Sequence, residues 1–290
     1  MKIEVEPPYL AQYQKDIIYD PARFTITEAS TKVGKTFSHL WWLFEKSHEQ
    51  KKPGANYWWV APIYSQAKIA FTRLHRVINQ VRGYQINESG LYIKTPHNST
   101  IWFKSAEKPD NLFGEDVFAV VFDEFTRARE DAWIALRTTL TATEGPCKFI
   151  GNVRGKNNWG YRMGVKARAG APGYRYFKVT AYDAVKAGIL KAEEVEQAKR
   201  DLPDLAFRQL YLGEALDLTA NPFGIEYIHR AIKPMSRNST EYCGIDLAKS
   251  VDWTVVVGLD RDGQVSLFDR WQSDWGQTRR RLIDIIGNKF

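Results

Sequence analysis

The sequence contains only two cysteines and three methionines, and it has no long apolar run. Cys147 and Cys243 have no CxxC or CxxH spacing, which argues against a disulfide framework and against a zinc site. No stretch approaches the roughly 18 apolar residues that a membrane span needs, and the N-terminal residues form no apolar signal segment. We therefore expect a soluble intracellular protein that is neither secreted nor membrane-bound.

What the chain does contain is an ordinary globular composition with a basic charge balance. Its 290 residues are 44% hydrophobic and 26% charged, enough for one large or two modest domains. The 41 Lys and Arg against 34 Asp and Glu give a formal charge of +7. This charge suits a polyanionic partner such as nucleic acid, although many enzymes without such a partner are equally basic.

The apolar pattern predicts alternating strands and helices. Strands are expected at 24–29, 57–61, 118–122, 147–150 and 174–180, with helices at 37–46, 65–79 and 131–140 and a hairpin at 91–94 and 100–104. Strands alternating with helices favour an α/β fold with a parallel sheet and flanking helices.

The pattern changes in the last third of the chain. A charged helical segment at 181–217 is followed by a polar, proline-containing stretch typical of a linker, and then by strands at 242–246, 253–259 and 265–271 and a helix at 278–286. We expect a first domain at 1–218, a linker at 219–240 and the beginning of a second domain at 241–290.

Residues 29–36 predict a phosphate-binding loop. A short strand runs into a small-residue turn that delivers Gly34, Lys35 and Thr36 to the start of a helix. Loop amides and a helix N-terminus offer partial positive charge to phosphate oxygens. Lys35 would reach the β- and γ-phosphates of ATP, and the Thr36 hydroxyl would bind Mg²⁺. The candidate binding residues of this loop are Ser30, Thr31, Lys32, Val33, Gly34, Lys35 and Thr36.

A second motif points to the same chemistry. The loop alone is also compatible with an ordinary turn, because Ala29 stands where the usual pattern has its first glycine. The apolar run 118–122, however, ends in two adjacent acids. Asp123 would bind Mg²⁺ through water or Thr36, and Glu124 would orient and deprotonate the attacking water. Taken alone, adjacent acids on a strand point to opposite sides, and one could simply cap a turn. The two motifs together predict an ATP site.

With these motifs the chain resembles the large subunit of a tailed-phage DNA-packaging terminase over about residues 9–290. The matching segments are 14–18, 29–36, 60–67, 105–114, 123–124, 150–155 and 242–246, in the family's order. The resemblance implies an ASCE-type P-loop NTPase core and a partial RNase H-like domain. It also implies ATP hydrolysis that drives translocation of double-stranded DNA. The subunits would form a homo-oligomeric ring with a portal protein and a terminase small subunit, in the host cytoplasm and away from membranes.

The resemblance also implies roles for single residues. Gln14 would hydrogen-bond the adenine, although a plain exposed helix glutamine fits the position too. Lys32 stands where many terminases carry an arginine, so the charge is kept and the planar guanidinium is lost. Asn152 would join Lys35 and Glu124 in catalysis by following the loss of the γ-phosphate, although asparagine is also a common turn residue. Arg127 and Arg154 are both candidates for an arginine finger, and neither is selected.

For the second domain the resemblance implies a nuclease site. Asp246 ends its first strand and would be the first ligand of a Mg²⁺ or Mn²⁺ pair. Asp252 would assist it or cap a turn. In the family the next acid lies on a strand after the helix at 278–286, beyond residue 290. We therefore expect nuclease activity to be absent from this chain.

Two other functions are compatible with these motifs. One is a helicase-like nucleic-acid-dependent ATPase with the same core, which would separate strands and have no portal partner. The other is a catalytically inactive prophage remnant, which would fold without hydrolysing ATP.

Overall fold

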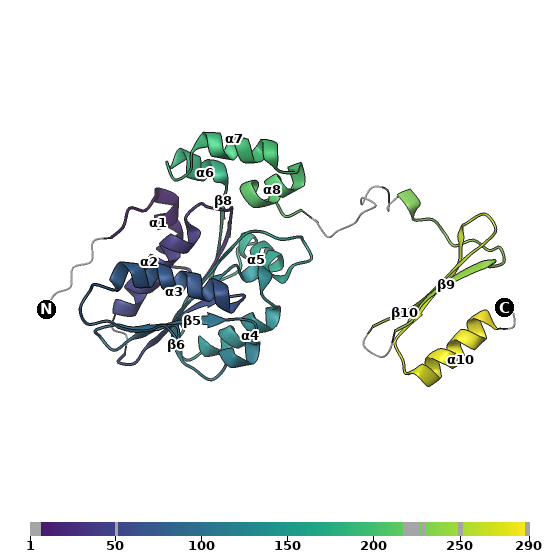
Figure 1. The fold of residues 1–290 in the computed structure, drawn as a ribbon, viewed down its shortest axis with the longest axis horizontal. Helices are drawn as coiled ribbons and strands as arrows, with labels where there is room; N and C mark the ends of the chain where they lie inside the picture. The colour runs from purple at the N-terminus through teal and green to yellow at the C-terminus, as the bar shows by residue number, and fades with distance from the viewer. Residues whose placement is uncertain (1–6, 50–51, 217–226, 228–229, 249–251, 288–290) are drawn as a thin grey trace. The chain divides into compact units, whose positions relative to one another are not determined.

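The computed structural model describes residues 7–49, 52–216, 227, 230–248 and 252–287. Its internal contacts divide the chain into two units, Met1–Thr219 and Ala220–Phe290 (Figure 1). The expected linker at 219–240 lies partly outside the described residues, at 219–226 and 228–229. Among the described helices, none combines the length and the apolar character needed to cross a lipid bilayer.

The first unit is built on an eight-stranded sheet with the order β3-β4-β5-β2-β6-β7-β1-β8. The strands are β1 (Phe24–Ala29), β2 (Asn56–Ala61), β3 (Gln85–Asn87), β4 (Tyr92–Lys94), β5 (Thr100–Ser105), β6 (Val117–Asp123), β7 (Cys147–Gly151) and β8 (Tyr174–Val179). The six strands from β5 to β8 in this order pair in parallel, whereas β3, β4 and β5 pair antiparallel. The predicted parallel sheet and hairpin are confirmed, and β3 is an additional short edge strand.

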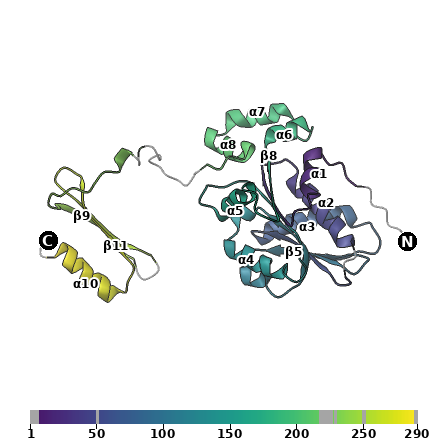
Figure 2. The same cartoon turned by 180° about the vertical axis from the view of Figure 1, so that it is seen from behind.

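Helices connect and cover these strands (Figures 1 and 2). They are α1 (Gln12–Ile18), α2 (Lys35–His48), α3 (Tyr64–Ile78), η1 (Pro109–Leu112), η2 (Phe125–Arg127), α4 (Glu130–Thr139), α5 (Trp159–Arg168), α6 (Ala181–Lys186), α7 (Ala192–Asp201) and α8 (Asp204–Leu212).

Both faces of the central strands are buried. In β2, Tyr57 and Trp59 belong to one core with α2 and α3, and Trp58 and Val60 belong to a second core with α4 and α5. Successive side chains of a strand point to opposite faces. An unbroken apolar strand therefore fills both cores, as expected for a parallel sheet covered on two sides.

The sequence pattern did not predict α5, because Gly160 and Gly164 lower helix propensity. The structure shows why glycine occupies both positions. A Cβ at Gly160 would lie 2.6 Å from a ring carbon of Phe125, and one at Gly164 would lie 2.7 Å from Oε1 of Glu28. Close packing of α5 against the sheet and against η2 thus stabilises the helix despite the low helix propensity of its two glycines.

The strand order brings three chain segments to one edge of the sheet. β6, β7 and β1 are neighbours, and their registers pair Asp123 with Ile150 and Glu28 with Gly151. The carboxyl ends of these parallel strands therefore meet at the same edge. The segments that follow, which begin at Ser30, Glu124 and Asn152, emerge side by side.

The second unit contains a three-stranded antiparallel sheet with the order β11-β10-β9 and one helix. Its elements are β9 (Tyr242–Asp246), β10 (Thr254–Leu259), β11 (Val265–Trp271) and α10 (Trp275–Ile286). The helix begins before the predicted residue 278 because the Asp274 side chain caps it, accepting a hydrogen bond from the Gln277 N–H at 3.0 Å. The Trp271 indole donates to the Thr278 hydroxyl at 3.1 Å and holds α10 to the sheet.

Candidate functional site

The loop between β1 and α2 has a backbone shape that depends on glycine. Gly34 precedes α2 with φ at 77°, in the left-handed region that residues with a Cβ rarely adopt. A Cβ there would also lie 2.4 Å from Nε2 of Gln14. Lys32 is left-handed as well, with φ at 60°, and its side chain is exposed. The helix begins at Lys35, two residues earlier than predicted, directly after the left-handed glycine.

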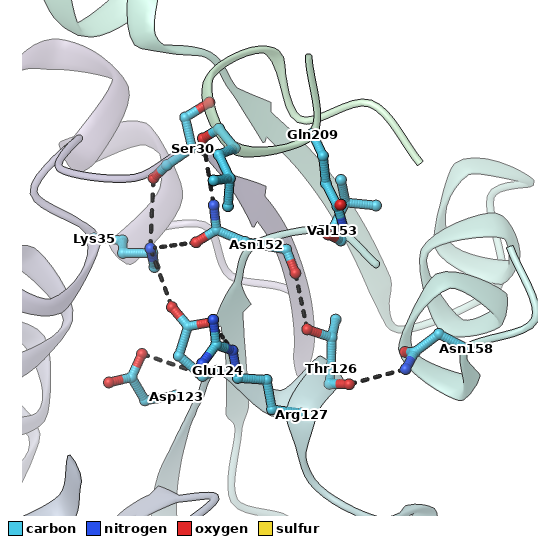
Figure 3. A network of polar contacts seen from close by, with 11 residues as sticks. Ser30, Lys35, Asp123, Glu124, Thr126, Arg127, Asn152, Val153, Asn158 and Gln209 are labelled. Carbon is cyan, nitrogen blue, oxygen red and sulfur yellow. Dashed lines mark hydrogen bonds and ion pairs between the residues drawn. The ribbon is translucent and has the colours of Figure 1, made fainter. Parts of the chain in front are cut away.

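The Lys35 ammonium is the centre of a polar network (Figure 3). Its Nζ lies 3.2 Å from Oε1 of Glu124 and donates hydrogen bonds to Oδ1 of Asn152 at 3.0 Å and to the Ser30 carbonyl at 3.4 Å. The Lys35 and Glu124 side chains are only 11% and 18% exposed, so water screens this pair less than a surface pair. The structure therefore brings together the three residues that the sequence proposed for catalysis.

Glu124 reaches Lys35 because the chain turns sharply after β6. Strand β6 ends at Asp123, and Glu124 adopts φ at 45° in the left-handed region. Such a conformation in a non-glycine residue is uncommon and is concentrated at functional sites. Arg127 Nε lies 3.7 Å from Oε2 of the same carboxylate, which places a second cation near Glu124. Adjacent acids on a continuous strand would point to opposite sides, and this turn removes that constraint.

Asp123 is buried beside Glu124. Its Oδ1 accepts a hydrogen bond from the Glu124 N–H at 3.0 Å. Burial, with a further contribution from the Glu124 charge, raises the pKa of Asp123 to about 7, and the Lys35 charge opposes this rise. A nearby cation would restore the ionised carboxylate. Asp123 at the end of β6 and the Thr36 hydroxyl in the first turn of α2 are hard oxygen donors of the type that Mg²⁺ prefers. Mg²⁺ takes few protein ligands alongside phosphate oxygens and water, so the chemistry of these two donors fits this ion.

Asn152 links Lys35 to the carboxyl end of α8. Its Nδ2 donates to the Leu210 carbonyl at 3.4 Å, and its backbone carbonyl accepts from the Thr126 hydroxyl at 2.8 Å. The loop between β1 and α2 contacts the same end of α8. The Thr31 N–H donates to the Leu210 carbonyl at 2.9 Å, and the Ser30 hydroxyl donates to the Tyr211 carbonyl at 2.6 Å.

Two further side chains, Gln209 and Asn158, support this network and were not predicted from the sequence. Gln209 Nε2 donates to the Val153 carbonyl at 3.0 Å, and Asn158 Nδ2 donates to the Thr126 carbonyl at 2.9 Å. Asn158 also caps α5 by accepting from the Gly160 N–H. A helix-capping asparagine before an apolar residue was the one sequence signal available. Backbone carbonyls as partners have no signature in a sequence.

Gln14 lies on α1 against the loop between β1 and α2. Its Oε1 accepts from the Ala11 N–H at 2.9 Å, and its Nε2 lies 3.4 Å from the carbonyl oxygens of both Val33 and Gly34. The side chain is 3% exposed, so it is not a plain surface glutamine. The neighbouring Tyr13 hydroxyl donates to the Val33 carbonyl at 2.7 Å, a contact with no signal in the sequence.

The remaining predicted site residues lie apart from this network. Lys32 lines a cavity with Glu194, Asp201 and Tyr211, and Arg154 is exposed. Asp246 belongs to the second unit, where it is exposed at the end of β9. Asp252 Oδ1 accepts from the N–H of the next residue, Trp253, at 2.8 Å. Within the part of the chain that the structure describes, no three His, Cys, Asp or Glu side chains cluster as a metal centre.

Comparison with known structures shows the fold. The mostly parallel sheet of the first unit matches solved structures of phage large terminases, which have a P-loop NTPase-type fold. The ATPase domain of the large terminase of Thermus phage P74-26 matches with a TM-score of 0.60 and 24% identity, covering 72% of this chain and 94% of that one. The large terminase of the thermophilic bacteriophage D6E in complex with ADP matches with a TM-score of 0.59 and 16% identity, covering 96% of this chain and 74% of that one.

The chain belongs to the terminase large subunit family, T4likevirus-type, N-terminal, whose model matches residues 26–229. The curated large terminase subunit of Thermus phage G20c is 26% identical over 281 residues, covering 80% of this chain. The chain spans 57% of the length of that relative.

Proposed function

We propose that the unit Met1–Thr219 binds and hydrolyses ATP and that this hydrolysis drives translocation of double-stranded DNA. The observation that carries the proposal is the contact of Lys35 with both Glu124 and Asn152. Lys35 directly follows Gly34, whose backbone is in the left-handed region. A lysine, a carboxylate and an amide converge there from segments that follow three neighbouring strands. This arrangement suits phosphoryl transfer, in which positioning and charge stabilisation supply most of the catalysis.

Each residue then has a distinct task. Lys35 and the amides of the loop hold the β- and γ-phosphates. Glu124 orients the attacking water and accepts its proton. Asn152 detects the departure of the γ-phosphate through its bond to Lys35 and passes the change to the end of α8. Thr36 and Asp123 would hold Mg²⁺, which would neutralise charge on the phosphate oxygens.

The translocation part of the proposal rests on family membership and on charge. The net charge of +7 suits contact with the phosphate backbone without base reading. We propose that the subunit acts in the host cytoplasm as a homo-oligomeric ring, with a portal protein and a terminase small subunit as partners. The second unit is proposed to be an RNase H-like domain, in which Asp246 at the end of β9 would be one ligand of a Mg²⁺ or Mn²⁺ pair.

Hydrolysis of Mg²⁺-ATP by the purified chain tests the enzymatic proposal. Lys35→Ala and Glu124→Gln are compared with the wild type, with Lys68→Ala and Glu88→Gln as controls because both residues are exposed and lie outside the network. We expect Glu124→Gln to lose at least about 100-fold in rate, the usual scale for a general base. Lys35→Ala should also lose most of its rate, because it removes the cation that holds the phosphates. The controls should retain activity. Equal rates in all five proteins would reject the ATPase and support an inactive remnant.

Coupling to DNA is tested separately. Addition of double-stranded DNA is expected to stimulate hydrolysis in a salt-dependent manner, since phosphate contacts weaken as salt rises. Separation of a duplex into single strands by this chain would contradict translocation of intact duplex and favour the helicase-like alternative. DNA cleavage with Mg²⁺ or Mn²⁺ that is lost in Asp246→Ala would show that the expected absence of nuclease activity is wrong.

A further inference from the structure

Two consecutive side chains of α1 donate hydrogen bonds to carbonyl groups of the loop between β1 and α2. The Tyr13 hydroxyl donates to the Val33 carbonyl at 2.7 Å, and Gln14 Nε2 lies 3.4 Å from the Val33 and Gly34 carbonyls. These contacts join residues that are 19 or 20 positions apart in the chain. Neither side chain belongs to the network around Lys35.

The bond from Tyr13 orients the Val33–Gly34 peptide, and Gln14 supports the Gly34 carbonyl together with the Ser38 N–H, which donates to it at 3.1 Å. In a trans peptide the carbonyl and the following N–H point in opposite directions. When the Val33 carbonyl faces α1, the Gly34 N–H faces away from α1, and the Gly34 carbonyl has the same relation to the Lys35 N–H. Anion-binding loops depend on amides that point together at the phosphate.

The fit between α1 and the loop is close. Gly34 has no side chain, and a Cβ at this position would lie 2.4 Å from Gln14 Nε2. Val33 is 1% exposed and packs in a small core with Ile17 and Ala29, against which the Tyr13 ring also packs. The ring is thus held in place by apolar contacts while its hydroxyl reaches the loop.

The chemistry of both side chains suits a permanent structural bond. Burial raises the pKa of Tyr13 to about 12, so its hydroxyl remains a donor at neutral pH. Gln14 also has its Oε1 bonded to the Ala11 N–H, which fixes the orientation of the amide and directs Nε2 at the loop. Both the oxygen and the nitrogen of the Gln14 amide therefore hydrogen-bond backbone groups of the protein.

We propose that Tyr13 and Gln14 are positioning residues that hold the phosphate loop in its triphosphate-binding shape, independently of the base of the nucleotide. This inference rests on the proposed function, because it presumes that the loop binds a triphosphate. It gives Tyr13 a role at the loop, and it gives Gln14 a task that differs from reading the adenine.

Binding of three ligands separates these roles. Calorimetric titration of the full chain in Mg²⁺ buffer uses ATP, GTP and inorganic tripolyphosphate. Tyr13→Phe removes one hydroxyl and keeps the ring. We expect this variant to bind all three ligands more weakly by a common factor of about threefold to tenfold, the range for one lost hydrogen bond. Gln14→Met, which keeps length and apolar bulk, is expected to show the same uniform loss.

The matched control is Tyr19→Phe. Tyr19 follows α1, and its hydroxyl donates to the Glu45 carboxylate at 3.0 Å, so this variant loses a hydroxyl contact that does not involve the loop. Its affinities are expected to equal those of the wild type. Thermal unfolding of each variant without ligand confirms that the folded protein is being titrated.

The outcomes are distinguishable. Wild-type affinities for all three ligands in Tyr13→Phe would overturn the inference and leave the proposed function intact. Loss of ATP binding alone, with GTP and tripolyphosphate unaffected in both variants, would also overturn it and would assign the adenine to α1. A wild-type chain that binds none of the three would refute the proposed function and the inference with it. A rise in KM with little change in kcat would support the inference, because hydrolysis groups are untouched.

Discussion

Nζ of Lys35 lies 3.2 Å from Oε1 of Glu124, so the cation proposed for phosphate is paired with the base proposed for water. The two groups are mostly buried, and Arg127 Nε is the second cation near the same carboxylate at 3.7 Å. In this arrangement the Glu124 carboxylate lies between two cations. A triphosphate bound at Lys35 would compete with Glu124 for the ammonium and would free the carboxylate to bind the attacking water.

This competition leads to a prediction about affinity. Glu124→Gln removes the negative partner of Lys35 and should bind Mg²⁺-ATP at least as tightly as the wild type, while hydrolysis falls by at least about 100-fold. Equilibrium titration and steady-state hydrolysis of the same preparation measure the two quantities. A variant that loses affinity and rate together would show that Glu124 holds the nucleotide itself.

Asn152 is predicted to act on rate more than on binding. Asn152→Ala removes the 3.0 Å bond to Lys35 and the 3.4 Å bond to the Leu210 carbonyl. Hydrogen bonds to charged groups contribute about 1.5–3 kcal/mol, which corresponds to a loss of roughly 10-fold to 100-fold in kcat. Asn79→Ala, at the exposed C-cap of α3, is the control. An unchanged kcat in Asn152→Ala would exclude Asn152 from catalysis.

The buried Lys148 should make the free energy of unfolding rise with pH in the alkaline range. This lysine of β7 is 1% exposed, and its Nζ donates to the Ile17 and Asp20 carbonyls and to the Thr25 hydroxyl. Burial lowers the pKa of Lys148 to about 8, below the value near 10.4 of an unfolded chain. Between these values the folded protein binds fewer protons than the unfolded chain, so the free energy of unfolding rises with pH.

The Lys148→Met variant isolates this contribution. Urea unfolding of wild type and variant at pH 7.5 and pH 10 should show the wild type gaining stability relative to the variant, by on the order of 2–3 kcal/mol. Tyrosines that titrate in the same range cancel in the difference. A pH-independent difference would show that Lys148 keeps an ordinary pKa.

Position 164 is predicted to need glycine because the Glu28 side chain leaves no room for a Cβ. Alanine is the better helix former, yet a Cβ at Gly164 would lie 2.7 Å from Glu28 Oε1 beneath α5. Gly164→Ala should therefore lower the free energy of unfolding by roughly 1–3 kcal/mol, as overpacking does. In a Glu28→Ala background the same substitution should be neutral or stabilising. A double-mutant cycle by urea unfolding measures the coupling, and additive effects would contradict the predicted clash.

Much of the fold could be predicted because its signals are local. The unbroken apolar strands 57–61 and 118–122 indicated a sheet buried on both faces, and the structure confirms this in β2 and β6. Gly34, Lys35 and Thr36 indicated a loop that leads into a helix, as observed. By contrast, α5 could not be predicted from propensity, because Gly160 and Gly164 are selected by contacts with η2 and β1.

The sequence by itself determined most of the helices and strands, the glycine-containing loop before α2 and the acidic end of β6. These features depend on the spacing of apolar residues, on glycine and on charge, all of which can be seen within a few consecutive residues. Only the tertiary structure decided how they meet. Lys35 and Asn152 are 117 residues apart, and Ser30 and Tyr211 are 181 apart. Their contacts follow from strand order and register, and Glu124 joins them through one left-handed turn after β6. Such contacts have no local signature, because they depend on where distant segments are placed by the packing of the whole sheet.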